Sequence, residues 1–289
     1  MARCLVTGHR GYIGSRLIKR LNDMGHIAIG IDLSDGKDIN SLQGLVEDND
    51  GNFHPFWSNF GAKYIFHLAC IPRVGYSIEE PVKTMANNVL AGSNVLNFAR
   101  KTGVKRVIYS SSSSIRGNGD GPTSPYALQK MVTEVECKLY PELYGMDTVS
   151  LRYFNVYSED QTVDGPYATA IANWMHYIRQ GKDPYITGDG TQRRDMLHVE
   201  DAVAANIFAM QHEDRFNGAA FDVGTGTNIS LNEVKDVVLK YHPDVNFKYV
   251  DPRPGDVMYT EASTYGLKKL GWQTKMSIQD GIKKCFRRL

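Results

Sequence analysis

The chain has 289 residues, with 33 Lys and Arg against 32 Asp and Glu, 42% hydrophobic residues and four cysteines. A net charge of +1 without a basic cluster argues against a binder of nucleic-acid duplexes, because phosphate affinity needs a surplus of Lys and Arg. No apolar run approaches the roughly 20 residues that cross a bilayer, and the N-terminus lacks the features of a signal peptide, so we expect no membrane contact and a cytoplasmic location.

Short apolar runs alternate with longer amphipathic segments through the first half of the chain. This alternation predicts βαβ units and an α/β fold with a doubly wound parallel sheet. The expected strands are Cys4–Val6, Ile27–Ile31, Tyr64–Leu68, Val104–Tyr109 and Thr148–Leu151. The expected helices are Tyr12–Met24, Ser41–Glu47, Pro81–Lys101 and Pro125–Tyr144.

The pattern loosens after about Leu151, where helices are separated by loops rich in Gly, Asp, Pro and Arg. These helices are expected at Tyr167–Gln180, Val199–Met210, Leu231–Tyr241 and Ser277–Arg287. We expect residues 1–155 to form a dinucleotide-binding domain, to which a segment of about 195–228 returns. Residues 156–289 would then form mainly a smaller α/β lobe that binds the substrate.

A glycine-rich turn, Thr7-Gly8-His9-Arg10-Gly11-Tyr12-Ile13-Gly14, follows the first strand and opens a helix. Its first glycine suits a tight turn, its second lets the backbone approach a pyrophosphate, and its third allows close packing of helix and strand. Asp32, at the end of the second strand, can bind the ribose hydroxyls of NAD and repel the extra phosphate of NADP. The pattern therefore predicts a Rossmann fold that binds NAD, and Arg10 leaves NADP open.

Two polar patterns lie further along the chain. Five serines, Ser110–Ser114, end the fourth strand, and Tyr126 and Lys130 share one face at the start of a helix. An ammonium beside a phenol lowers the pKa of the phenol, so Tyr126 becomes a usable base, and a nearby serine hydroxyl can bind the same substrate oxygen. Either pattern alone is more often a polar loop or an amphipathic helix start.

The cysteines Cys4, Cys70, Cys137 and Cys285 lie far apart and form no CxxC pair. Such spacing predicts buried thiols rather than disulfides or zinc ligands, and we expect no metal site.

Taken together, the motifs resemble the extended short-chain dehydrogenase/reductase family, the nucleotide-sugar epimerases and dehydratases, along nearly the whole chain. Closest is the resemblance to UDP-glucose and UDP-N-acetylglucosamine 4-epimerases. The matching segments are Thr7–Gly14, Asp38-Ile39, His67-Leu68-Ala69, Asn88-Val89, the Ser112, Tyr126 and Lys130 set, Leu151–Tyr157, Gly188–Asp195, Val199-Glu200-Asp201 and Arg253–Asp256.

The resemblance also implies roles for single residues. Tyr126 would be the catalytic acid/base, assisted by Ser112, and Lys130 would bind the nicotinamide ribose. The cofactor would further contact Gly8, Arg10, Gly11, Tyr12, Ile13, Gly14, Asp32, Asp38, Ile39, Leu68, Ala69, Asn88, Ser110 and Tyr153. The substrate would contact Arg73, Ser112, Ser113, Ser114, Asn155, Tyr167, Arg194, Arg253, Asp256 and Thr260.

Three of these residues, Asn155, Arg194 and Arg253, would hold the substrate pyrophosphate, a role that suits planar guanidinium groups. The alternative for the two arginines is surface ion pairing with the adjacent Asp195 and nearby Asp256.

Ser113 and Ser114 stand where the 4,6-dehydratases and glucuronate decarboxylases of the family carry acidic residues, which disfavours elimination and decarboxylation. The resemblance then favours a UDP-hexose 4-epimerase: Tyr126 takes the C4 hydroxyl proton, NAD+ takes the C4 hydride, and the hydride returns to the other face of a 4-keto sugar. Two features favour N-acetylated sugars over UDP-glucose and UDP-galactose, namely Gly165–Ile171 and the small Thr260 where glucose-restricted epimerases carry Tyr.

Several alternatives stay open. Arg116, where the family usually has Tyr, keeps a UDP-glucuronate 4-epimerase open, unless it is a surface residue beside Asp120. A 4-keto-sugar reductase, a rearranged 4,6-dehydratase and a dinucleotide-sensing regulator are the others. Apolar stripes on Pro81–Lys101 and Pro125–Tyr144 pair into a four-helix bundle in this family, which implies a homodimer, the alternative being that both stripes are core.

Overall fold

The computed structural model describes residues 1–161, 163, 169–252, 257–287 and 289. The chain forms two compact units, and it passes between them several times. Unit 1 consists of Met1–Ile115, Pro122–Arg152 and Val203–Phe221. Unit 2 consists of Arg116–Gly121, Tyr153–Ala202 and Asp222–Leu289.

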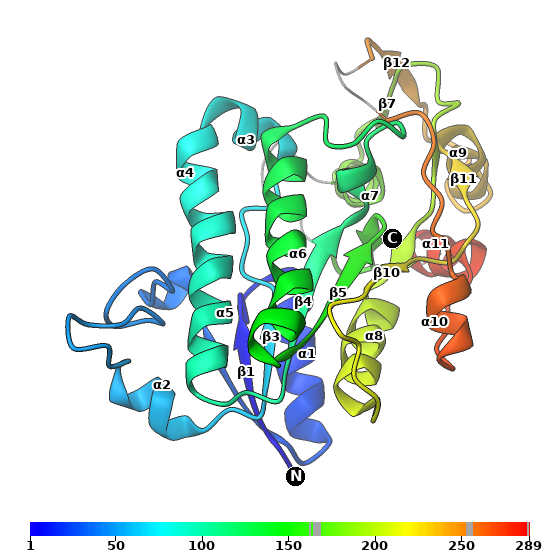
Figure 1. The fold of residues 1–289 in the computed structure, drawn as a ribbon. Helices are drawn as coiled ribbons and strands as arrows, with labels where there is room; N and C mark the ends of the chain where they lie inside the picture. Colours follow the sequence, from blue (N-terminus) through cyan, green and yellow to red (C-terminus); the bar gives the residue numbers. More distant parts are fainter. Residues whose placement is uncertain (162, 164–168, 253–256, 288) are drawn as a thin grey trace. The chain divides into compact units, whose positions relative to one another are not determined.

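A six-stranded parallel sheet, which the prediction of a doubly wound sheet anticipated, is the centre of unit 1 (Figure 1). Its spatial order is β10-β5-β4-β3-β1-β2. Because β2 and β3 flank β1 on opposite sides, the strand order reverses there, and the carboxyl ends of β1 and β3 form the crevice where such sheets bind ligands. The strands are β1 Arg3–Thr7, β2 Ile27–Ile31, β3 Tyr64–His67, β4 Arg106–Ser112, β5 Asp147–Tyr153 and β10 Ala220–Val223.

Helices cover this sheet, and α5 and α6 lie against one face of it (Figure 1). Strand residues such as Leu5, Ile65 and Val107 are buried against Val95 and Phe98 of α5. Each such side chain contributes about 1.5–3 kcal/mol through burial. The helices are α1 Tyr12–Asp23, α2 Pro55–Phe60, α3 Val74–Glu79, α4 Pro81–Met85, a π-helical turn Ala86–Leu90, α5 Ala91–Lys101, α6 Pro125–Tyr144 and α8 Val199–Gln211, with 3-10 turns at Leu33–Asp35 and Ser113–Arg116.

The helix predicted over Ser41–Glu47 is wrong, because this segment forms a series of turns. The N–H of Leu45 donates to the carbonyl of Ile39, and a Cβ at Gly44 would lie 1.9 Å from the carbonyl oxygen of Asp38. Glycine thus permits a turn that a helix-forming residue would block. The sequence analysis also missed α2, whose first residue is Pro55, a position where proline loses no helical hydrogen bond.

Unit 2 contains short strands that pair two by two around a separate core. The strand pairs are β8 Arg193–Arg194 with β11 Ile229–Ser230, β7 Tyr185–Thr187 with β12 Lys248–Val250, and β6 Val156–Tyr157 with β9 Leu197–His198. The helices are α7 Ala170–Arg179, α9 Leu231–Leu239, α10 Tyr265–Lys269 and α11 Ile278–Phe286. Trp174, Ile186, Val234 and Phe286 are among the buried residues of the core.

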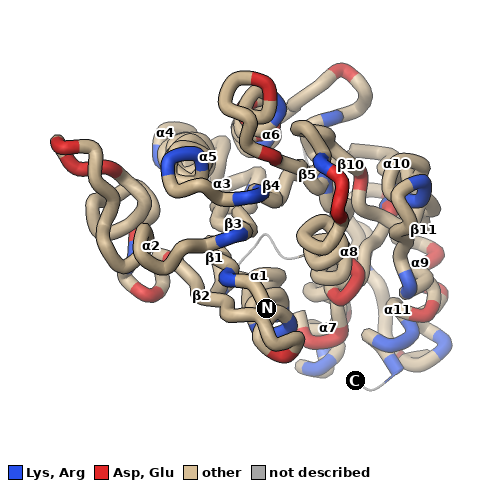
Figure 2. The backbone as a smooth tube through the Cα atoms, turned by 60° about the horizontal axis from the view of Figure 1, so that its bottom comes forward, with Lys and Arg blue, Asp and Glu red and all other residues tan. Residues whose placement is uncertain are grey.

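Charges of both signs alternate along the backbone in Figure 2, without a long stretch of one sign. Over the residues that the structure describes, no helix has the length and apolar character needed to span a membrane. The same residues contain no group of three or more His, Cys, Asp or Glu that could hold a metal ion. All four cysteines are free, but Cys70 is half-buried rather than buried as predicted.

Arg106 and Asp147 form a buried ion pair at the amino ends of β4 and β5, with 2.5 Å between Nε and the carboxylate. The guanidinium also donates to the carbonyl oxygens of Ala209, His212 and Asp214 at 2.6–2.8 Å. This one side chain therefore ties the segment after α8 to the sheet.

We expect Arg106→Met to lower the free energy of unfolding by about 3–5 kcal/mol, because Asp147 would remain buried without its cation. The control is Lys19→Met, which removes an exposed pair with Asp23 and should cost less than about 1 kcal/mol. Urea unfolding followed by circular dichroism measures both. Equal losses in the two variants would contradict this account of Arg106.

Candidate active site

The glycine-rich turn lies between β1 and α1, at the switch point of the sheet. Gly8 has φ +70°, and a Cβ there would lie 2.7 Å from the backbone nitrogen of Ala69 in the loop after β3. A Cβ at Gly14 would lie 2.1 Å from the carbonyl oxygen of Gly8. Gly11 precedes the first residue of α1, where backbone N–H groups attract phosphate. The turn therefore fits the pyrophosphate of a dinucleotide.

Asp32 lies beside this turn. Its carboxylate accepts hydrogen bonds from the Arg10 N–H at 3.0 Å and from the N–H and hydroxyl of Ser34 at 3.0 and 2.8 Å. Burial raises the pKa of Asp32, but these hydrogen bonds outweigh burial and lower it overall. An ionised Asp32 suits a ribose diol and repels a 2′-phosphate. Arg10 is bound by Asp35, with 2.9 Å between Nε and the carboxylate.

The loop after β3 is attached to β1 by side-chain hydrogen bonds. The Thr7 hydroxyl lies 2.8 Å from Nδ1 of His67 and accepts the N–H of Ala69 at 3.1 Å, and the N–H of Leu68 donates to the Thr7 carbonyl. Burial, with a contribution from the charge of Lys130, lowers the pKa of His67 to about 3, so this ring is neutral at neutral pH.

Other predicted cofactor residues have structural contacts of their own. Asn88 accepts the N–H of Ile71 at 2.8 Å and donates to Gln129 at 2.7 Å, so it fixes the same loop. The Asp38 carboxylate accepts the N–H of Asn40, and Ile39 is buried in the core of unit 1. Tyr12 and Ile13 begin α1, where the Arg16 guanidinium covers the Tyr12 ring, and Tyr153 is buried at the end of β5.

The predicted catalytic residues are brought together in unit 1. Ser112 is the last residue of β4, and its Oγ accepts hydrogen bonds from the N–H and hydroxyl of Ser114 at 3.2 and 2.9 Å. The Lys130 ammonium, only 4% exposed, donates to the Ser110 carbonyl oxygen at 2.6 Å. Tyr126, one helical turn before Lys130, is hydrogen-bonded to Ser112. Ser113 begins the 3-10 turn, and Arg73 precedes α3.

The predicted lowering of the Tyr126 pKa is wrong in this structure. Burial raises the pKa of Tyr126, the nearby Cys70 thiol adds to the increase, and the hydrogen bond with Ser112 offsets only part of it. Lys130 directs its ammonium to the Ser110 carbonyl instead. Tyr126 therefore carries its proton at neutral pH.

Three predicted substrate residues gather in unit 2. The Asn155 amide, on a backbone with φ +23°, donates to the Asp195 carbonyl at 2.7 Å and lies 3.3 Å from the Thr260 hydroxyl. The Thr260 N–H donates to the carbonyl of Arg193, next to Arg194. Asn155 and Arg194 line a pocket of about 170 Å³. Tyr167, Arg253 and Asp256 lie outside the described residues.

Asp195 holds the loops of this pocket. Its buried carboxylate accepts the N–H groups of Thr225, Gly226 and Ala262 at 2.9–3.0 Å. Burial raises the pKa of Asp195, and these hydrogen bonds only partly offset the effect. A carboxylate so engaged is an internal support, which removes the alternative of a surface ion pair with Arg194.

Arg116 pairs with the buried Asp222 at 2.7 Å, and not with Asp120 as the alternative from the sequence had it. Its charge is therefore already neutralised within unit 2, which weakens the case for an acidic sugar.

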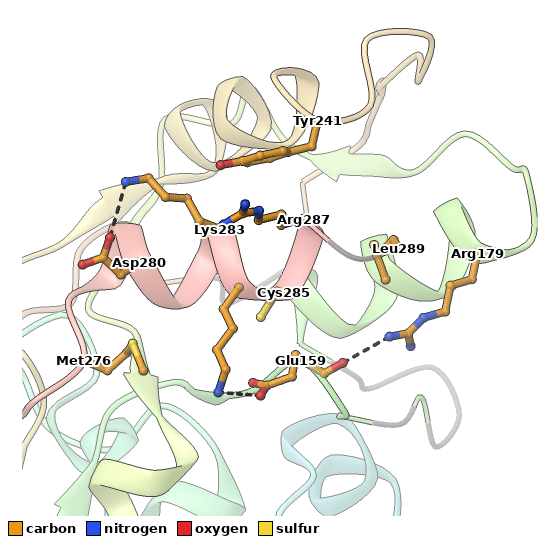
Figure 3. A pocket seen from close by; sticks show the side chains of 10 residues that line it. Glu159, Arg179, Tyr241, Met276, Asp280, Lys283, Cys285, Arg287 and Leu289 are labelled. Carbon is orange, nitrogen blue, oxygen red and sulfur yellow. Dashed lines mark hydrogen bonds and ion pairs between the residues drawn. The ribbon is translucent and has the colours of Figure 1, made fainter.

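A larger pocket of about 560 Å³ lies beside α11 (Figure 3). Lys284 contacts Glu159 at 2.6 Å, and Lys283 contacts Asp280 at 3.4 Å. Burial raises the pKa of Glu159, but hydrogen bonds from Lys284 and His198 outweigh burial and lower it to about 2. Because these carboxylates already neutralise the lysines, we assign this pocket no function.

The sequence analysis missed two groups of polar residues near the predicted sites. Glu134 continues the spacing of Tyr126 and Lys130 along α6 and binds Arg152 of β5. Gln192 lines the pocket of unit 2, and its amide oxygen lacks a hydrogen-bond partner among the described residues. The i+8 position of Glu134 was a readable signal.

Residues 4–224 match the model of the NAD dependent epimerase/dehydratase family. The chain belongs to this family. It is 30% identical to a UDP-glucose 4-epimerase of Mycolicibacterium smegmatis, over 98% of this chain and 96% of the relative. The predicted membership of the extended short-chain dehydrogenase/reductases and the predicted NAD cofactor are thereby confirmed.

Two solved structures of similar fold are a UDP-N-acetylglucosamine 4-epimerase from Methanobrevibacter ruminantium M1 in complex with UDP-N-acetylmuramic acid and a Thermus thermophilus UDP-glucose 4-epimerase in complex with NAD. The first has a TM-score of 0.86 and 28% identity and covers 99% of this chain and 97% of its own. The second has a TM-score of 0.83 and 29% identity and covers 99% of both chains.

We expect Gly8→Ala to weaken NAD binding at least about tenfold, because the new Cβ combines a strained φ with a contact against the Ala69 backbone. Gly25→Ala is the matched control, since Gly25 has φ +80° with nothing within 4 Å of a built Cβ. Both variants carry the strain, and only Gly8→Ala carries the contact. Isothermal titration with NAD+ decides; equal affinities would contradict the assignment of this turn.

Proposed function

We propose that the protein is an NAD-dependent UDP-hexose 4-epimerase. One observation carries the proposal: the Ser112, Tyr126 and Lys130 cluster stands at the end of β4 while positions 113 and 114 are serines. Such a cluster holds one proton-transfer group, which suits reversible oxidation of a hydroxyl. Elimination and decarboxylation call for a further acid or base, which a serine hydroxyl of ordinary pKa does not supply.

The residues divide the work between them. Bound NAD+ supplies an acceptor and donor of hydride for C4 of the sugar. Tyr126 accepts the proton of the C4 hydroxyl and returns it after the sugar has turned. Ser112 hydrogen-bonds the same oxygen and orients it. Lys130, held by Ser110, contributes positive charge that favours the phenolate.

We propose that unit 1 binds the cofactor and unit 2 the UDP-sugar. Asp32 and the turn from Gly8 to Gly14 would hold the dinucleotide. Asn155 and Arg194, which line the pocket of about 170 Å³, would hold the pyrophosphate. The neighbouring UDP-sugar enzymes of known structure support this division, and so does the bidentate geometry of a guanidinium toward phosphate oxygens.

N-acetylated UDP-hexoses are the sugars we propose first. Thr260 supports them, because a threonine beside Asn155 occupies less space than the tyrosine of glucose-restricted epimerases and leaves room for a C2 substituent. A difference of this size in a pocket gives a modest preference rather than strict selection.

Product analysis tests the reaction. The protein is incubated separately with UDP-glucose, UDP-N-acetylglucosamine and UDP-glucuronate, and the C4 epimers are resolved by chromatography. We expect epimerisation without net NADH formation, fastest for the N-acetylated sugar, and a kcat about 10²–10⁴-fold lower in Tyr126→Phe. Tyr140→Phe, on the same helix, serves as the control with unchanged kcat. A stable 4-keto product or stoichiometric consumption of NADH would rule out the epimerase.

We also propose a homodimer formed through α4 and α6. Apolar side chains on both helices are exposed in the single chain: Val82 and Met85 on α4, and Val135, Leu139 and Leu143 on α6, at 41–83% exposure. The last three repeat every four residues, so they form one stripe. Such a stripe beside other exposed apolar residues is typical of an interface.

Leu139→Glu is therefore expected to convert the dimer to a monomer, because the carboxylate would have to be buried in the interface. Met24→Glu is the control, since Met24 is 41% exposed at the end of α1 and away from these helices. Size-exclusion chromatography with light scattering gives the mass of each variant. A monomeric unmodified protein, or a dimer that survives Leu139→Glu, would refute this interface.

A further inference from the structure

Strands β4 and β5 carry an ion pair at each end. Arg106 and Asp147 pair at the amino ends, where the sheet binds no ligand. Arg152 of β5 and Glu134 of α6 pair at the carboxyl ends, where Ser110, Ser111 and Ser112 lie. Both pairs are buried in part or fully, so the two ends of the same strands offer a built-in comparison.

The contacts of Glu134 are directional and complete. One carboxylate oxygen accepts the Ser111 hydroxyl at 2.6 Å and Nε of Arg152 at 3.0 Å. The other oxygen accepts Nε of Arg152 at 3.1 Å and a further hydrogen bond from its Nη2. Glu134 is 8% exposed and Ser111 only 2%. The carboxylate therefore links three elements: α6, β4 and β5.

Glu134 also shares a helix face with the catalytic residues. Tyr126, Lys130 and Glu134 stand at i, i+4 and i+8 of α6. Lys130 donates to the carbonyl of Ser110, and Glu134 accepts the hydroxyl of the next residue, Ser111. Two successive residues of β4 are thus bonded to two successive turns of α6, which fixes how far the helix can slide or rotate along the strand.

Stability alone does not explain this arrangement. A buried ion pair gains little over an apolar pair of similar shape, because taking both charges out of water costs about as much as their attraction returns. What the pair offers beyond an apolar contact is direction, since a carboxylate bound by a guanidinium fork and a hydroxyl has one geometry. Direction is needed where a reacting group must be held in place.

We propose that Glu134 and Arg152 are positioning residues, which hold α6 on β4 so that Tyr126 stays beside Ser112 and Lys130 stays on Ser110. The proposal rests on the proposed epimerase function for its kinetic readout. Neither residue touches the reacting atoms; they act through Tyr126 and Lys130.

Two double variants test it, each of which removes both charges of one pair so that no buried charge is left alone. Glu134→Gln with Arg152→Met removes the pair at the catalytic end. Arg106→Met with Asp147→Asn removes the pair at the other end and is the control. We expect both to lower the urea midpoint, whereas only the first lowers kcat, about 10–100-fold with KM within twofold, because small misplacements of reacting groups cost rates of this order.

A second readout is independent of turnover. In protein labelled at tyrosine Cζ with carbon-13, the Tyr126 signal, assigned with Tyr126→Phe, is followed against pH by NMR. We expect its titration to move in the first double variant and to match the unmodified protein in the second. Equal kcat losses in the two variants, or an unmoved Tyr126 titration in the first, would overturn the proposal. If the unmodified protein epimerises no UDP-sugar, the proposed function fails while the NMR comparison still decides the positioning role.

Discussion

The hydrogen bond from the Lys130 ammonium to the Ser110 carbonyl oxygen is the contact on which the candidate catalytic cluster depends. A buried ammonium without a partner is costly, so α6 must lie against the carboxyl end of β4 wherever Lys130 is charged. Once that contact is made, the 3.6-residue helical period leaves Tyr126 little choice of place, and it meets the hydroxyl of Ser112. The cluster is a consequence of how a helix and a strand pack.

Unit 2 is organised by the opposite charge. The Asp195 carboxylate is buried and holds the backbone N–H groups of Thr225, Gly226 and Ala262. Its own carbonyl accepts the Asn155 amide. A carboxylate that gathers loop N–H groups makes a rigid frame from segments without long strands or helices, because each N–H would otherwise be unsatisfied. The pocket beside Arg194 owes its shape to this frame.

The strands, the glycine turn and the catalytic triplet were predictable because each is encoded within a short stretch of sequence. Local pattern failed where contacts between distant segments decided the outcome. The turn at Gly44 follows from its approach to Asp38, which no periodicity reveals. The Glu134 and Arg152 pair joins residues 18 positions apart, on a helix and a strand that each look ordinary alone. The pKa of Tyr126 depends on burial, which sequence does not quantify.

The raised pKa of Tyr126 sets a condition on any chemistry in this site. A phenol that keeps its proton at neutral pH serves as an acid, and it becomes a base only if positive charge stabilises the phenolate. Lys130 is the cation that α6 brings to this region, and its ammonium is fixed by Ser110. The distance from that charge to the phenol is then set by the packing of α6 on β4. Contacts that fix this packing, including those of Glu134, therefore act on the strength of the base.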